Sequence, residues 1–315
     1  MHPAYSVIFF TVASGAGYGL LILLSMLMAT DRMPVNTWFA GTAFTVALAA
    51  VTLGLLSSTY HLGKPMRTWR ALSQWRSSWL SREGVLALVT YLPALALALH
   101  TVKVLDLGRA LGPLAVITAV VATATVFSTA KIYQSLKTIQ QWNNQWTVIN
   151  YLVLALASGA VLLHALTEIF STVIQSVPIY TVLMLFVASY TKRRYWQFID
   201  NTNHPSTPEN ATGLGQIGKV RLFQGPHAAD NYLMKEMGYS VARQHAEKLR
   251  VLALALGFAI PVVAVIASSL LSGDVSKVLA CIAIVPLAIG FVIKRWLFFA
   301  EARHVVTLFY GRENA

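Results

Sequence analysis

The feature that most constrains this chain is a series of eight apolar segments, most of them about 20 residues long. They span residues 6–28, 37–59, 84–102, 108–130, 148–167, 173–190, 251–271 and 278–298. An α-helix needs roughly 20 apolar residues to cross the hydrocarbon core of a bilayer. Only 11% of the residues are charged, whereas soluble domains carry about 25%. The sequence therefore predicts an all-α integral membrane protein, with eight transmembrane helices forming a single domain over residues 1–315.

Charge distribution predicts how these helices are oriented. Eight crossings would leave both termini on one side of the membrane, here called side A, and the opposite face is side B. All but four of the 24 lysines and arginines fall on side A. By the positive-inside rule, side A is cytoplasmic. The long loop at 191–250 is then cytoplasmic too, and its length predicts a platform for a peripheral subunit rather than a simple connector.

Cysteine content limits the redox chemistry of the isolated protein. Its one cysteine, Cys281, lies in the last apolar segment and is expected to be a small buried residue. One thiol cannot build a four-thiolate iron–sulfur cluster or a Cys-rich zinc site. We therefore expect no metal site in this protein, and any iron–sulfur clusters would belong to a partner.

Several polar residues lie inside or near the ends of the apolar segments. His164 and Glu168 share one face of the fifth segment near side B, and His100 lies at the end of the third. We expect these groups to reach the side B interface, with haem ligation by the two histidines as the alternative. Lys294 and Arg295 lie near the end of the last segment, where long side chains can reach the membrane surface.

The most informative stretch, at residues 60–84, reads YHLGKPMRTWRALSQWRSSWLSREG. A histidine, five basic residues, three tryptophans and one carboxylate meet there beside the membrane surface. A quinone needs an apolar or aromatic slot, hydrogen-bond donors for its carbonyls and titratable groups for its protons. His61 can donate and titrate near neutral pH, and Glu83 can relay protons. In the alternative reading, both residues only complement the charges of helix ends.

Two stretches resemble a known family. The segment SSTYHLGKPMR, and the carboxylate Glu83 shortly after SWLS, resemble the membrane anchor subunits of dimethyl sulfoxide reductases. The opening HPAYSVIFFTVASGAGYGLL is more similar to the anchors of sulfite-oxidising molybdoenzymes in that family. The resemblance extends over all eight segments but is sharp only in these stretches. In the opening, Gly15, Gly17 and Gly19 are expected to allow close helix packing.

The resemblance implies a function, cofactors and partners. Such anchors bind quinone (ubiquinone or menaquinone), lack haem, and dock an iron–sulfur subunit that serves a molybdopterin catalytic subunit. The protein would be non-catalytic alone, and we expect contact with membrane lipid but not with nucleic acid. Sulfite oxidation with quinone reduction is the leading expectation. The alternatives are a quinol-oxidising anchor of an S- or N-oxide reductase and, from a different class, a transporter.

The same resemblance places the quinone site between the second and third segments. The family's quinone histidine falls on His61, and its functional carboxylate on Glu83. For the rest of the site, we expect an aromatic wall from Tyr60, Trp75 or Trp79, while Arg67 or Arg70 would hold the headgroup or the partner.

Overall fold

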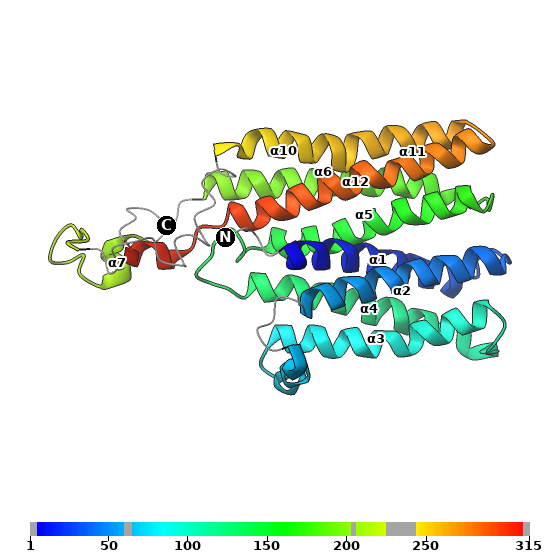
Figure 1. Ribbon diagram of the computed structural model, residues 1–315, viewed down its shortest axis with the longest axis horizontal. Helices are drawn as coiled ribbons and strands as arrows, with labels where there is room; N and C mark the ends of the chain where they lie inside the picture. The colour runs from blue at the N-terminus through cyan, green and yellow to red at the C-terminus, as the bar shows by residue number, and fades with distance from the viewer. Residues whose placement is uncertain (1–4, 60–64, 203–205, 225–243, 311–315) are drawn as a thin grey trace.

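The protein is a bundle of long helices that run side by side along one axis (Figure 1). The computed structural model describes residues 5–59, 65–202, 206–224 and 244–310. The long helices in these ranges are α1 (Tyr5–Ala29), α2 (Thr37–Thr59), α3 (Trp79–Thr101), α4 (Leu111–Gln134), α5 (Gln145–Ile169), α6 (Ser176–Asn201), the continuous run α10 (Ala246–Leu254), η3 (Ala255–Ala259) and α11 (Ile260–Leu270), and α12 (Asp274–Ala300). Short helices are η1 (Pro65–Gln74), η2 (Gly108–Ala110), α7 (Pro208–Thr212) and η4 (Val305–Tyr310).

Seven helices in the described part of the sequence are long and apolar enough to cross a membrane. All eight predicted segments correspond to long helices, whose ends differ from the predicted ones by a few residues except at the end of α6. Of these eight helices, α6 is the one that does not meet the criteria of length and apolar composition for a membrane span. This helix has Lys192, Arg193 and Arg194 in its second half and continues to Asn201. A multi-pass membrane protein is therefore supported, while the eighth crossing stays a prediction. Because 191–201 extend α6 and 246–250 begin α10, the predicted loop at 191–250 is shorter at both ends.

The start of α1 and the end of η4 lie at one end of the bundle, here called end A (Figure 1). The η1 segment, the 135–144 connection and α7 lie at the same end, whereas the short connections 30–36, 102–110, 170–175 and 271–273 lie at end B. End A therefore corresponds to the predicted side A. Which compartment it faces stays a prediction.

Glycines allow the helix backbones to approach closely. A Cβ added at Gly19 of α1 would overlap the backbone carbonyl of Ala155 on α5, and one at Gly159 would overlap Gly19 itself. A Cβ at Gly17 would lie 2.6 Å from the carbonyl oxygen of Ala47 on α2. Close packing is thus confirmed for Gly17 and Gly19. The prediction of close packing is wrong for Gly15, because a Cβ added there would meet nothing within 4 Å.

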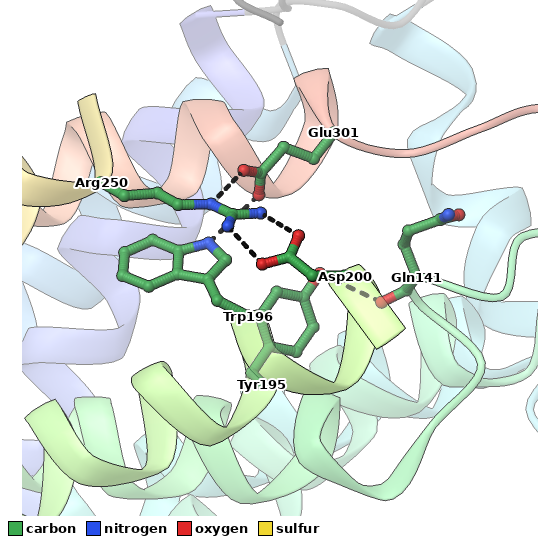
Figure 2. Close-up of polar contacts among 6 residues, drawn as sticks. All are labelled: Gln141, Tyr195, Trp196, Asp200, Arg250 and Glu301. Atoms are coloured by element: carbon green, nitrogen blue, oxygen red, sulfur yellow. Dashed lines mark hydrogen bonds and ion pairs between the residues drawn. The ribbon is translucent and has the colours of Figure 1, made fainter. Parts of the chain in front are cut away.

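An ion-paired cluster joins three helix ends at end A (Figure 2). The guanidinium of Arg250 on α10 lies 2.6 Å from a carboxylate oxygen of Asp200 on α6 and 2.7 Å from one of Glu301, which follows α12. The indole of Trp196 donates to the other Glu301 oxygen at 3.1 Å. The two helices that flank the 202–245 segment are therefore fastened to each other and to α12.

Candidate functional site

A pocket of about 470 Å³ lies at end A between α1, α2, η1, α3 and α4. Its walls are mostly apolar. The larger apolar lining residues are Val7, Phe10, Leu55, Trp69, Leu72, Leu80, Leu88 and Ile132. The side chains of Glu83, Thr129 and Tyr133 bring polar groups into this apolar lining. A large, mainly apolar cavity with a few polar groups is typical of a small-molecule site.

Glu83 is the one carboxylate in the pocket lining. It is the fifth residue of α3, its side chain is buried, and the Thr129 hydroxyl of α4 donates a hydrogen bond to it. Among the described residues it forms no salt bridge. A buried carboxyl group without a cation, inside a membrane-spanning segment, is a candidate functional group. Glu83 is buried and lies beyond the first turn of α3, to which the effect of the helix dipole is confined. This position argues against the alternative that Glu83 only complements the charge of a helix end.

The η1 segment covers the side of the pocket nearest end A. Trp69 and Leu72 contribute lining side chains, and the Arg70 guanidinium lies 5.4 Å from the centre of the Trp69 ring. The Ser81 hydroxyl of α3 donates to the carbonyl of Ala71, which holds η1 against α3. Of the predicted residues, the structure thus places Glu83 in the pocket and Arg70 beside it.

The predicted aromatic wall is different in the structure. Trp75 is 52% exposed and lies against Arg76, and Trp79 packs edge-on against Phe127 at 6.0 Å. Neither lines the pocket, because the Trp75 side chain is turned to the surface and that of Trp79 packs against α4. The tryptophan in the lining is Trp69, which belongs to the same basic stretch but was not among the predicted wall residues.

Three predicted residues remain, and the structure describes one of them, Arg67. Arg67 is exposed and does not line the pocket. Tyr60 and His61 lie outside the described residues, so their predicted roles stay predictions. Thr59, the residue that directly precedes them, does line the pocket.

A second polar region, inside the bundle, was not expected. Tyr133 of the pocket stacks on Tyr151 of α5 with ring centres 5.9 Å apart, and the Arg295 guanidinium lies 4.0 Å from the centre of the Tyr151 ring. Lys294 and Arg295 are only 4% and 8% exposed. The prediction that they reach the membrane surface is therefore wrong, because this face of α12 is turned toward α1 and α5. Hydropathy gives no signal that distinguishes the two orientations.

At end B the predicted polar residues are hydrogen-bonded to protein groups. His164 is fully buried, and its Nε2 lies 2.7 Å from the Ser268 hydroxyl, so the prediction that it reaches the interface is wrong. Glu168 accepts a hydrogen bond from Ser276. The Nδ1 of His100 lies 3.1 Å from the carbonyl oxygen of Leu105.

Two expectations concern sulfur and metal. Cys281 is exposed on α12, not buried as predicted, since a helix in a membrane can present apolar and sulfur-bearing side chains to lipid. Within the described ranges, no group of three His, Cys, Asp or Glu side chains is placed to hold a metal ion.

Comparisons with known proteins find one matching family and two similar sequences. A family model described as the DMSO reductase anchor subunit (DmsC) matches residues 1–311. One subunit of the sulfite dehydrogenase of Allochromatium vinosum is 32% identical, over 98% of this sequence and 99% of the relative. One component of the anaerobic dimethyl sulfoxide reductase of Haemophilus influenzae is 23% identical, over 51% of this sequence and 57% of the relative. No solved structure matches.

Proposed function

The protein belongs to the family of DMSO reductase anchor subunits, and from that premise we propose that it is the quinone-reactive anchor of a sulfite-oxidising molybdoenzyme complex. Electrons would pass from iron–sulfur clusters of a partner subunit to the quinone pool of a bacterial inner membrane. The relative named as a sulfite dehydrogenase subunit is similar along its whole length, whereas the dimethyl sulfoxide reductase relative matches about half of this sequence. This difference favours sulfite oxidation over reduction of an S- or N-oxide.

The observation that carries the proposal is the end A pocket with its buried carboxyl group. A quinone ring fits an apolar slot of about 470 Å³, with Trp69 at its rim. A bound quinone supplies a two-electron acceptor that also takes up two protons. Glu83 can hold a proton at the pocket wall, and the Thr129 hydroxyl keeps its carboxyl group oriented. The fit therefore rests on the volume, apolar lining and single carboxyl group of this pocket.

His61 and the two arginines complete the proposed site. We place His61 as donor to a quinone carbonyl because Thr59, two residues earlier, lines the pocket. Arg70 lies on the ring of Trp69 and, with the exposed Arg67, would contact either the headgroup or the docked partner. Electron entry from end A is reasonable because the pocket and the surface segments η1 and α7 lie at the same end.

A charge-neutral change at Glu83 tests the proposal. In the assembled complex, Glu83→Gln keeps the shape and the hydrogen-bonding capacity of the side chain but cannot exchange a proton. Loss of a positioned acid or base typically costs 10²–10⁴-fold in rate. We expect quinone-coupled sulfite oxidation to fall by at least about 100-fold, while sulfite oxidation with an artificial acceptor, which takes electrons from the catalytic subunits directly, is unchanged.

The matched control is Asp274→Asn, a charge-neutral change of an exposed carboxylate at end B, the opposite end of the bundle from the pocket. It should leave both activities at the wild-type level. If Glu83→Gln retained full quinone-coupled turnover in an intact complex, the carboxyl group would have no proton role and the pocket would lose its main support. His61→Ala, assayed in the same way, tests the part of the site that lies outside the described residues.

A further inference from the structure

Two neighbouring cations of α12 are buried inside the bundle without an acidic partner. Lys294 and Arg295 are 4% and 8% exposed, and neither forms a salt bridge with any described residue. The Nε of Arg295 has no hydrogen-bond partner among the described residues. The Lys294 ammonium lies 3.5 Å from the centre of the Phe291 ring. Removing an unpaired charge from water is strongly unfavourable. A buried lysine can respond by losing its proton, but an arginine guanidinium stays charged and needs a compensating group.

Both cations line two small cavities in the bundle interior, each of about 20 Å³. The first lies between α1, α4, α5 and α12 and has hydroxyl groups in its wall, including those of Ser14, Tyr18 and Ser158. The second extends toward end A, where Asn150 and Lys192 line it. The Tyr18 hydroxyl and the Asn150 Oδ1 are buried and have no hydrogen-bond partner in the described part of the structure. Unsatisfied polar atoms from several helices thus face the same interior space.

No carboxylate of the described residues lines either cavity. Glu301, at the nearby end of α12, is already engaged by Arg250 and Trp196 (Figure 2). Glu83 accepts its hydrogen bond from Thr129 and lines the end A pocket. Lys192 also lines the second cavity, and the carboxylate of Glu301 partly offsets its charge. Among the described side chains, no carboxylate forms a salt bridge with Lys294 or Arg295.

We propose that Lys294 and Arg295 bind a small monatomic anion of the halide class, chloride in the cell, in the first cavity. The ammonium group, the guanidinium Nε–H and the unpartnered Tyr18 hydroxyl are donors suited to an anion, whereas the Ser14 hydroxyl already donates to the carbonyl of Phe10. A single water needs about 10–15 Å³ of such space. A cavity of about 20 Å³ therefore favours a monatomic ion over a larger oxyanion or a quinone ring. The anion neutralises charge where the protein offers no carboxylate.

The experiment measures anion binding to the purified full-length protein, together with any subunits that purify with it. Retention of radioactive ³⁶Cl⁻ should be saturable, displaced by bromide and not displaced by sulfate. Replacing chloride by gluconate at constant ionic strength and pH should lower the melting temperature, because a ligand that binds only the folded state stabilises it. We expect a shift on the order of a few °C.

Substitutions of the two cations test whether they form the anion site. Lys294→Met and Arg295→Gln should abolish saturable ³⁶Cl⁻ retention, whereas Lys277→Met, an exposed lysine at end B, should leave it unchanged. If these variants do not fold, bromide in crystals of the wild-type protein still locates the anion by anomalous scattering. No saturable retention by the wild-type protein would overturn the proposal and leave water in both cavities. Retention that persists in folded Lys294→Met and Arg295→Gln variants would also overturn it.

Discussion

At the residue scale, the end A pocket combines the buried carboxyl group of Glu83 with an apolar lining to which Trp69 contributes. Glu83 was expected at this site from the polar and aromatic stretch around it and from the family resemblance, and the structure buries it in a pocket wall. The sequence could not show which of Trp69, Trp75 and Trp79 lines the pocket. Their directions depend on the 3₁₀ geometry of η1 and on how Ser81 fastens it to α3. Lys294 and Arg295 were misplaced because orientation around a helix axis depends on packing partners that hydropathy does not reveal.

Two of these tryptophans make a matched pair for a test of the pocket. Trp69 lines it, whereas Trp75 does not, and both are partly exposed. Because burial of a large apolar side chain against a ligand contributes about 1.5–3 kcal/mol, Trp69→Ala should raise the KM for quinone at least about tenfold. Trp75→Ala should leave this KM unchanged. Equal effects of the two changes, measured by quinone titration of sulfite oxidation, would place the quinone elsewhere.

At the element scale, the long helices follow from the sequence because a membrane span must be long, apolar and helical. Each of the eight predicted segments corresponds to a long helix of the structure. What the sequence could not supply is which helices pack together. The glycines of the opening motif indicated that α1 approaches some other helix closely, but not that Gly19 meets Gly159 and Ala155 of α5. Such pairing depends on contacts between segments far apart in the sequence.

The α1–α5 crossing gives a prediction for this scale. Gly19→Ala puts a methyl group where the backbone of α5 already lies, and backbone, unlike a flexible side chain, does not move aside easily. Overpacking of this kind costs typically 1–3 kcal/mol, and more where relaxation is blocked. We expect a melting temperature several degrees lower, or failure to fold, measured by thermal unfolding in detergent.

Gly112 on α4 is the control for that substitution. A Cβ there would meet nothing within 4 Å, so Gly112→Ala adds the same methyl group without a clash. Alanine also has the higher helix propensity, so stability should stay the same or rise slightly. If both variants melted at the wild-type temperature, the helices would not be in backbone contact at Gly19.

At the scale of the whole molecule, alternation of the helices puts η1, the 135–144 connection and α7 at end A (Figure 1). We predict that end A faces the cytoplasm, because nearly all lysines and arginines outside the spans lie there. Alkaline phosphatase, which is active only outside the cytoplasm, should be inactive when fused after Ala315 and active when fused in the connection between α11 and α12. The opposite pattern of activities would place end A outside the cytoplasm. The basic residues of end A would then form a contact surface for an acidic partner subunit.

The last prediction concerns docking. Electrons must come from a partner near the pocket, and a connection as long as 202–245 exceeds what is needed to join α6 to α10. The Arg250 ion pairs hold the two flanking helices together without help from this connection. Replacing residues 206–224 by a short Gly/Ser linker should therefore leave the bundle inserted but release the catalytic subunits from the membrane.

Two variants separate docking from stability. Arg250→Gln breaks the ion pairs, so it should lower the melting temperature, yet the catalytic subunits should stay bound because the surface residues of 206–224 are intact. The linker variant should show the reverse: little change in melting temperature, but sulfite-oxidising activity recovered in the soluble fraction. If the linker variant retained the catalytic subunits in the membrane, η1 rather than the 202–245 connection would be the principal contact, since it is the other end A segment beside the pocket.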